Sequence, residues 1–324
     1  MDIQNILSLV EDDLVRVEEE FKKNLSSRVG LIPTVGDYVL RSGGKRLRPI
    51  LLLMASKLTG YSGDHHVRLA SVVEFIHTAT LLHDDVVDNA ELRRGLKSAN
   101  AVWGNEASVL IGDFLYSKSF SIAVSCDNLK LLEVLSDATT DMARGMVFEL
   151  IKTNDIETTE EDYIQIIIDK TAVLIAAACQ IGGIVGNVSP GQEQAMRDFG
   201  MNLGIAFQLM DDSMDYVSNE EDFGKTIGTD LQEGKVTLPL IKAVRECNAG
   251  EKEALGKLLG QESTSESDLK MALEMINKYD GIQYTVGMAK SYIDKAIDNL
   301  APFTDSEAKS GLISLAGYVL EREN

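Results

Sequence analysis

Residues 74–88 read EFIHTATLLHDDVVD, an apolar stretch of helical pattern that ends in the aspartates Asp84, Asp85 and Asp88. On a helix, the first and last of these carboxylates lie four residues apart, share one face and repel each other. A chain tolerates such repulsion beside an apolar run chiefly where a cation lies between the carboxylates. The stretch therefore predicts a long core helix with an acidic, cation-binding end.

The same pattern occurs a second time further along the chain. Residues 206–215 read AFQLMDDSMD and place Asp211, Asp212 and Asp215 after another apolar run. A single cluster of this kind is usually a solvated helix face, but the apolar flanks and the duplication argue against that interpretation. Oxygen ligands that leave room for water and phosphate suit Mg²⁺. If the two helices pack as neighbours, as helices around a metal in a bundle do, the pair predicts a Mg²⁺–diphosphate site.

Composition indicates one all-α domain over residues 1–324. The chain has 324 residues, of which 44% are hydrophobic and 6% aromatic, with only five prolines, and its apolar positions recur at helical spacing. A net charge of −20 argues against nucleic acid or an anionic membrane as the main partner, because phosphate backbones select basic surfaces. The scattered cysteines form no zinc or disulfide pattern: Cys126, Cys179 and Cys247.

Helices are expected along the whole chain, whereas the sequence predicts no series of β-strands. They cover residues 3–24, 30–41, 48–59, 65–89, 100–124, 128–152, 160–187, 191–218, 236–248, 251–260, 266–279, 282–300 and 305–321. The charged residues 1–24 lack the apolar segment of a signal peptide. Residues 172–186 are uncharged but fall short of the roughly 20 apolar residues that a membrane span needs. A cytoplasmic protein without transmembrane helices is therefore expected.

Three basic motifs accompany the acidic ones. GGKRLRP (43–49) is a glycine turn before a proline-initiated helix, and helix N-termini favour anions. RRG (93–95) follows the first aspartate cluster, and FGKT (223–226) with DLQEGK (230–235) follows the second. Isolated basic pairs are ordinarily surface charge, but this placement favours a shared role in binding a diphosphate, with arginine as a bidentate fork and lysine as a movable charge.

The helix expected over residues 65–89 carries further candidates. His77 lies seven residues before Asp84 and hence on the same face, where both a structural role and donation to a second anion stay open. Four other side chains of this helix are expected either to line an apolar cavity or to belong simply to the core: Val72, Ile76, Ala79 and Thr80.

Taken in order, these motifs resemble those of the trans-isoprenyl diphosphate synthases, and most of all the bacterial long-chain enzymes of the octaprenyl diphosphate synthase type. The likeness covers nearly the whole chain. It rests on GGKRLRP (43–49), EFIHTATLLHDDVVD (74–88), RRG (93–95), GDFLY (112–116), DKTA (169–172), FQLMDDSMDY (207–216) and FGKTIGTDLQEGKVTLPLI (223–241). The resemblance implies the isoprenoid synthase fold, an all-α bundle around a deep central cavity, and a homodimer.

The resemblance also implies roles for individual residues, motif by motif. The implied Mg²⁺ ligands are Asp84, Asp88 and Asp211, with support from Asp85, Asp212 and Asp215. The implied isopentenyl diphosphate site is Lys45, Arg48, His77 and Arg94. The implied allylic diphosphate site is Arg93, Lys170, Lys225 and Lys235, with Thr171 and Gln208 near the reacting carbons. Glu149 stands where related enzymes often carry glutamine, so its contribution stays open.

The implied activity is the Mg²⁺-dependent, head-to-tail addition of isopentenyl diphosphate to an allylic diphosphate, with farnesyl diphosphate as the expected primer and about three Mg²⁺ per site. Ionisation, condensation and elimination require no protein nucleophile. One helical turn below Asp84 the side chains of Ala79 and Thr80 are small, which by analogy predicts a long product of about C40, and Phe120 is a candidate for the cavity floor. Heptaprenyl, nonaprenyl and decaprenyl products are the neighbouring alternatives.

Two other functions fit less well. Terpene cyclases also ionise a diphosphate, but they typically replace the second aspartate cluster and lack GGKRLRP. Non-catalytic partner subunits of prenyl synthases generally lose the aspartates, and none is missing here. A role in making quinone side chains is expected, while transient contact with a membrane surface during product release stays open.

Overall fold

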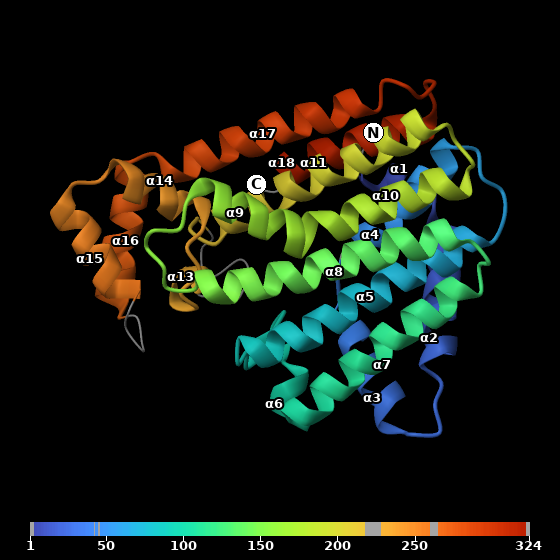
Figure 1. Cartoon of the computed structure of the whole chain (residues 1–324), viewed down its shortest axis with the longest axis horizontal. Coiled ribbons are helices and arrows are strands. Elements are labelled where there is room, and N and C mark those ends of the chain that lie inside the picture. The colour runs from blue at the N-terminus through green and yellow to red at the C-terminus, as the bar shows by residue number, and fades with distance from the viewer. Residues whose placement is uncertain (1–2, 42, 45, 218–227, 260–264, 322–324) are drawn as a thin grey trace. The chain divides into compact units, whose positions relative to one another are not determined.

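The computed structural model describes residues 3–41, 43–44, 46–217, 228–259 and 265–321. Its described part is helical apart from turns and one pair of two-residue strands (Figure 1). The chain forms two compact units. Unit 1 comprises Met1–Thr139, Leu174–Gly200 and Asn299–Leu315, and unit 2 comprises Thr140–Val173, Met201–Asp298 and Ala316–Asn324.

The elements of unit 1 come mostly from the first third of the chain. They are α1 (Ile3–Ser8), α2 (Glu11–Leu25), α3 (Leu31–Arg41), α4 (Leu47–Leu58), α5 (His65–Val87), β1 (Leu92–Arg93), β2 (Leu96–Lys97), α6 (Ala99–Trp103) and α7 (Asn105–Val124). Residues of α8 (Leu129–Lys152), α10 (Val173–Val185), α11 (Pro190–Met214) and α18 (Glu307–Leu320) belong to both units.

Unit 2 is built from the later elements. They are α9 (Glu160–Ile167), the π-helical turn η1 (Ile168–Ala172), α13 (Thr229–Gln232), α14 (Leu238–Glu246), α15 (Ala249–Leu259), α16 (Glu266–Lys278) and α17 (Gly281–Asn299), of which only Asn299 belongs to unit 1. Side-chain caps define two of the helix starts. Thr159 and Asp162 form a capping box before α9, and Ser265 and Asp268 form another before α16.

Helix α5 is the core of unit 1. Most of its side chains are buried around the whole helix, as expected of a helix that is apolar on every side. It packs against α2, α4 and α7, and Figure 1 shows α5 and α7 side by side. The Phe21 and Phe75 rings stack at a centroid distance of 3.9 Å. At Gly112 of α7, an added Cβ would lie 2.3 Å from Nε2 of His83, so this glycine permits the close approach of the two helices.

The structure confirms the all-α fold class and refines the predicted elements. The helix predicted over 3–24 is divided between α1 and α2, and the one over 160–187 contains η1. The hairpin of β1 and β2 was not predicted, because strands of two residues are too short to show an alternating pattern. The single domain and the deep central cavity stay predictions.

Two helical segments of the described chain are long and apolar enough to cross a membrane, Asn105–Val124 and Glu160–Val185. Length and composition alone cannot separate such a segment from the core helix of a globular protein. In the second segment, 72% of the most apolar window is buried inside the structure, as in a core helix.

Candidate active site

Both aspartate clusters lie at the C-terminal end of a long helix. Asp84, Asp85 and Asp88 close α5, and Asp211, Asp212 and Asp215 close α11. In each cluster, the first and last aspartates are partly exposed and the middle one, Asp85 or Asp212, is buried. A helix C-terminus carries partial negative charge, so three carboxylates there are unfavourable by themselves. Their oxygens fit a hard divalent cation, which would offset that repulsion.

Asp85 is held inside unit 1 by the hairpin that follows it. Arg93 Nε donates to Asp85 Oδ1 at 2.6 Å. Burial raises the pKa of Asp85, and the adjacent Arg93 opposes that rise. The turn between the strands consists of Arg94 and Gly95, with φ of 53° and 76°. Two residues with positive φ are the requirement of a type I′ turn, and this turn pairs β2 with β1, the strand that carries Arg93.

Arginines surround His77 on the same unit. Burial first, and then the charges of Arg48, Arg94, Arg93 and Arg46, hold the pKa of His77 well below its ordinary value, although the ring keeps some exposed surface. The imidazole is therefore neutral at physiological pH and offers one donor and one acceptor. Unit 1 thus places three of the residues predicted to bind isopentenyl diphosphate in one electropositive neighbourhood: Arg48, His77 and Arg94.

An ion pair links Arg46, the residue just before α4, to α5. Arg46 has φ of 49° and donates from Nη1 to Glu74 Oε1 at 2.6 Å and from Nη2 to the carbonyl of Leu40 at 3.2 Å. The Glu74 side chain is only 8% exposed. Arg46 therefore anchors the start of α4 to α5 in unit 1.

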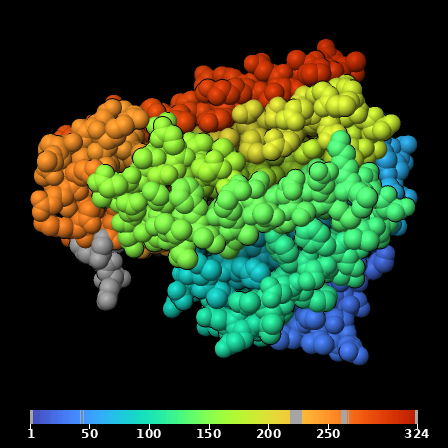
Figure 2. Space-filling model, in the orientation of Figure 1, coloured from blue at the N-terminus to red at the C-terminus, as the bar shows by residue number. Residues whose placement is uncertain are grey.

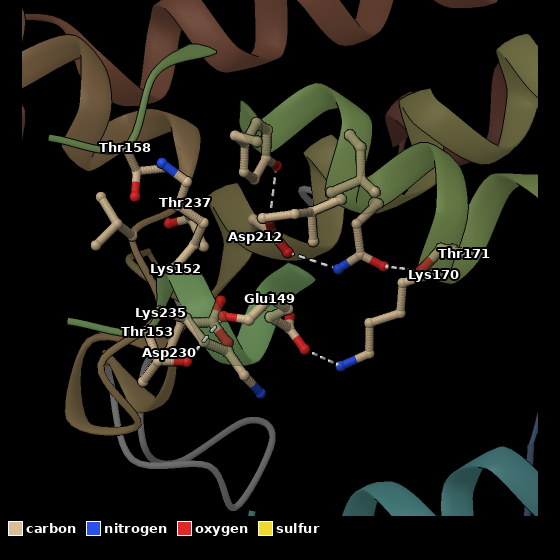
Figure 3. Close-up of a pocket in the computed structure, with 15 residues that line it drawn as sticks. Glu149, Lys152, Thr153, Thr158, Lys170, Thr171, Asp212, Asp230, Lys235 and Thr237 are labelled. Carbon is tan, nitrogen blue, oxygen red and sulfur yellow. Dashed lines mark hydrogen bonds and ion pairs between the residues drawn. The ribbon is translucent and has the colours of Figure 1, made fainter. Parts of the chain in front are cut away.

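In unit 2, a chain of hydrogen bonds leads to the buried aspartate (Figure 3). Tyr163 Oη donates to Asp212 Oδ2 at 2.6 Å, and Gln208 Nε2 donates to Asp212 Oδ1 at 2.6 Å. Thr171 Oγ1 donates to Gln208 Oε1 at 3.0 Å. Burial raises the pKa of Asp212, the two donors oppose this, and the charges of Asp211 and Glu149 add to the rise.

The π-helical turn η1 presents Lys170 and Thr171. Its Asp169 side chain is buried and accepts from Arg144 Nε at 2.9 Å, from Arg144 Nη2 at 3.0 Å and from Gln165 Nε2 at 2.9 Å. At Gly145 of α8, an added Cβ would lie 2.8 Å from both Asp169 Cβ and Lys170 N, so the two segments approach closely. Single π-helical turns are frequent at functional sites, and this one is fixed by a bidentate ion pair.

A cavity of about 120 Å³ lies beside this turn and has ionisable groups of both signs in its wall. Lys170 Nζ donates to Glu149 Oε2 at 2.5 Å, and Lys235 Nζ donates to Glu233 Oε2 at 2.6 Å. The groups that line it include Glu149, Lys152, Tyr163, Lys170, Thr171, Gln208, Asp212, Asp230, Lys235 and Thr237. The combination of movable ammonium groups and carboxylates fits a small anion that binds together with a cation.

Most of the predicted site residues are grouped within one unit or the other. Unit 1 contains Asp84, Asp85, Asp88, Arg48, His77, Arg93 and Arg94, and unit 2 contains Lys170, Thr171, Gln208, Asp211, Asp212, Asp215 and Lys235. Lys45 and Lys225 lie outside the described residues. Within the part of the chain that the structure describes, no three carboxylate, imidazole or thiol groups close on a single metal position.

Sequence reasoning missed several residues of this neighbourhood. Tyr163 contacts Asp212, and Asp169 with Arg144 fixes η1. Asp230 belongs to the DLQEGK motif but was given no role; its backbone N–H donates to Asp215 Oδ2 at 3.0 Å. The available signal for Tyr163 was its place seven residues before Lys170, two helical turns earlier on the same side.

Comparison with known proteins identifies the family. Residues 30–276 match the family model of the polyprenyl synthetases. The chain belongs to the polyprenyl synthetase family. It is 41% identical over 323 residues to octaprenyl diphosphate synthase from Escherichia coli, with all of both chains covered. This family is one of prenyltransferases, so the predicted enzyme class is confirmed.

Solved structures of polyprenyl synthetases agree with this assignment. A decaprenyl diphosphate synthase from Rhodobacter capsulatus matches with a TM-score of 0.95 and 39% identity, over 99% of each chain. A polyprenyl synthase from Caulobacter crescentus CB15, complexed with calcium and isoprenyl diphosphate, has the same score and identity over 100% of this chain and 98% of that one. The predicted function, a long-chain trans-polyprenyl diphosphate synthase, is confirmed at that level.

Proposed function

We propose that this polyprenyl synthetase adds isopentenyl diphosphate repeatedly to farnesyl diphosphate and makes a product of about C40. The observation that carries the proposal is the shared design of the two aspartate clusters, each at a helix C-terminus with its outer carboxylates partly exposed and its middle one buried. The octaprenyl synthase from Escherichia coli, a relative at 41% identity, supports the chain length. Heptaprenyl, nonaprenyl and decaprenyl products are the outcomes that would revise it.

Asp84, Asp88 and Asp211 would hold the divalent metal, which we take to be about three Mg²⁺ per site. The donor set fits, because carboxylate oxygens are the ligands that Mg²⁺ prefers and the two helix ends need positive charge. The calcium and isoprenyl diphosphate in the Caulobacter crescentus synthase support a divalent ion beside the diphosphate. When bound, the metal supplies charge that stabilises the departing diphosphate.

The protein residues bind and orient the two substrates. Arg48, His77 and Arg94, together with Lys45, hold the diphosphate of isopentenyl diphosphate. The ammonium and guanidinium groups of the allylic site hold the other diphosphate: Arg93, Lys170, Lys225 and Lys235. Such fixed charges stabilise the diphosphate most as its charge develops, which is where preorganised electrostatics help a reaction. Thr171 and Gln208 lie near the reacting carbons, and their hydrogen bond to each other at 3.0 Å orients both side chains.

The reaction begins when the allylic C–O bond breaks and its electron pair leaves with the diphosphate. The double bond of isopentenyl diphosphate then attacks the allylic cation and forms the new C–C bond. A proton is lost to the departing diphosphate, and a longer allylic diphosphate results. The protein supplies no nucleophile, so its side chains act through charge, orientation of the substrates and exclusion of water.

Ile76, Ala79, Thr80 and Phe120 are proposed to set product length. Ile76 and Ala79 are fully buried, Thr80 is 9% exposed, and the Phe120 ring lies 6.1 Å from that of Tyr116. The direct test is incubation with Mg²⁺, isopentenyl diphosphate and C10, C15 or C20 primers, with product length read by mass spectrometry. Ala79→Tyr should shorten the product, because a phenol would fill the space one turn below Asp84. An unchanged distribution in a folded variant would show that these residues line no growing chain.

A cytoplasmic homodimer is the proposed assembly. Apolar side chains of α7 are uncovered on the single chain: Leu110 is 67% exposed and Val124 is 58% exposed. Figure 2 shows the α7 segment at the surface of the face in view. Apolar surface of this kind supports an interface between copies. Leu110→Glu should therefore produce monomers in sedimentation experiments, and a variant that remains dimeric would place the interface elsewhere.

A further inference from the structure

The two described lysines of the allylic site each lie against a glutamate. Lys170 contacts Glu149 at 2.5 Å and Lys235 contacts Glu233 at 2.6 Å. The Lys170 and Glu149 side chains are 21% and 23% exposed, so the pair is reached by solvent and by a ligand. Figure 3 shows Lys170 extending from η1 towards Glu149 of α8. An anion that binds Lys170 must therefore compete with a carboxylate already in place.

Only the end of Lys170 is free to change its contacts, because its backbone is fixed. The neighbouring Asp169 is buried and held by Arg144 and Gln165, and Gly145 keeps α8 close to η1. The lysine side chain, by contrast, is flexible and carries a point charge without a required geometry of approach. Such a group can pass from one anion to another while the helix that carries it stays in position.

Glu149 carries the negative charge that competes with an anionic ligand for Lys170. A glutamine at this position would present no negative charge to Lys170. Glu149 also contributes to the negative charge that raises the pKa of Asp212, so its carboxylate faces the same cavity as the second aspartate cluster. Its charge therefore opposes the binding of any anion there and attracts Lys170, one of the ammonium groups that the anion would use.

We propose that Glu149 is a positioning residue, and that its carboxylate and the allylic diphosphate bind the ammonium group of Lys170 in turn. Glu149 holds Lys170 before the diphosphate binds, and takes it back when inorganic diphosphate leaves. The inference rests on the proposed function, because the anion is the leaving group of that reaction. A synthase that repeats its condensation must discharge inorganic diphosphate after every addition, so a carboxylate that competes for Lys170 speeds each release.

The primary test is the binding of inorganic diphosphate with Mg²⁺ to the full-length protein, measured by calorimetry. Glu149→Gln should bind it about tenfold more tightly than the wild type, since a competing charge-assisted contact is lost. Glu149→Asp withdraws the carboxylate by one methylene and should bind it about two- to threefold more tightly. Unchanged or weaker binding by Glu149→Gln would overturn the proposal.

A matched control separates this exchange from a general effect of charge. Glu157 is also in unit 2, pairs with Lys252 at 2.8 Å and has a side chain that is 69% exposed. Glu157→Gln removes the same charge and should leave diphosphate binding and turnover unchanged. An equal tightening in Glu157→Gln would assign the effect to net charge and would also overturn the proposal.

Kinetics distinguish the exchange from a structural role. Glu149→Gln should lower both the inhibition constant of inorganic diphosphate and the KM of the allylic substrate, without changing the KM of isopentenyl diphosphate, and kcat should fall. A fall in kcat without this split would indicate only structural damage and contradict the exchange. Calorimetry measures diphosphate binding without turnover, so the proposed function and the exchange at Lys170 are tested separately. A wild type that extends no prenyl primer defeats the proposed function, whereas an active wild type with unaltered binding in Glu149→Gln defeats only the exchange.

Discussion

In unit 1 the buried aspartate of the acidic cluster is held by a guanidinium group, whereas in unit 2 it is held by a phenol and an amide. Arg93 contacts Asp85 at 2.6 Å, while Tyr163 and Gln208 contact Asp212 at the same distance. The guanidinium group of Arg93 compensates the charge of Asp85, whereas the neutral donors to Asp212 supply no compensating charge. The same sequence pattern at two helix ends has thus been given two different electrostatic settings by the surrounding structure.

The cations of the two units differ in a matching way. The proposed anion site of unit 1 is rich in arginine around a neutral His77, and the proposed site of unit 2 has lysines paired with glutamates. A guanidinium fork holds a diphosphate in one orientation, while an ammonium group moves between partners. In the proposed reaction, isopentenyl diphosphate keeps its diphosphate and the allylic substrate loses it. If the proposed sites are right, the arginines beside His77 suit a diphosphate that stays on its substrate, and the lysines of unit 2 suit one that leaves.

The largest expected effect is on kcat and concerns the aspartate clusters, which both units have. Asp84→Ala and Asp211→Ala should each lower kcat by about a thousandfold, because each removes a proposed metal ligand from the charge-stabilising system. Steady-state assays at saturating Mg²⁺ would measure this, with circular dichroism to show that both variants fold. If either variant kept more than about a tenth of the activity, the equivalence of the two clusters would be broken.

The next effect is on stability and concerns unit 1. Arg46→Ala leaves the nearly buried Glu74 without its 2.6 Å partner and should lower the free energy of unfolding by about 3 kcal/mol. Urea denaturation would measure it. The matched control is Lys257→Ala, which breaks an exposed pair with Glu253 and should cost about 0.4 kcal/mol. Equal losses in the two variants would show that Arg46 does not anchor the start of α4.

A smaller effect tests the lysines of unit 2. Lys170→Arg should lower kcat by about tenfold, because a guanidinium group binds carboxylate and diphosphate in a bidentate manner and exchanges them slowly. The KM of isopentenyl diphosphate should not change. Full activity in Lys170→Arg would remove the contrast between a fixed arginine site and a movable lysine site.

The smallest effect is a pH dependence in unit 1. His77 has a folded-state pKa well below its ordinary value of 6.5, so the unfolded chain takes up a proton below pH 6.5 before the folded protein does. Stability from this group is therefore present above pH 6.5 and is lost as pH falls towards the folded pKa, by about 1 kcal/mol per pH unit. Between pH 7.0 and pH 5.5, the midpoint of urea unfolding should fall less in His77→Gln than in the wild type. Parallel falls would mean that His77 is not held neutral.

Much of the fold and the chemical content of the site could be predicted from sequence, because they depend on local spacing. The four-residue separation of Asp84 and Asp88, and of Asp211 and Asp215, places each pair on one helix face wherever the helix lies. The long apolar runs likewise predict buried helices such as α5. The hairpin of β1 and β2 escaped prediction because its turn depends on two backbone angles and not on an apolar pattern.

The sequence by itself determined the helical architecture and supplied carboxylates, arginines and lysines at the ends of the right segments. The tertiary structure alone decided which partner each charge received. Arg46 meets Glu74, Lys170 meets Glu149 and Tyr163 meets Asp212 across 28, 21 and 49 positions of the chain, respectively. The physical reason is that helical spacing is set by bonds between near neighbours, whereas burial and ion pairing arise only when distant helices pack.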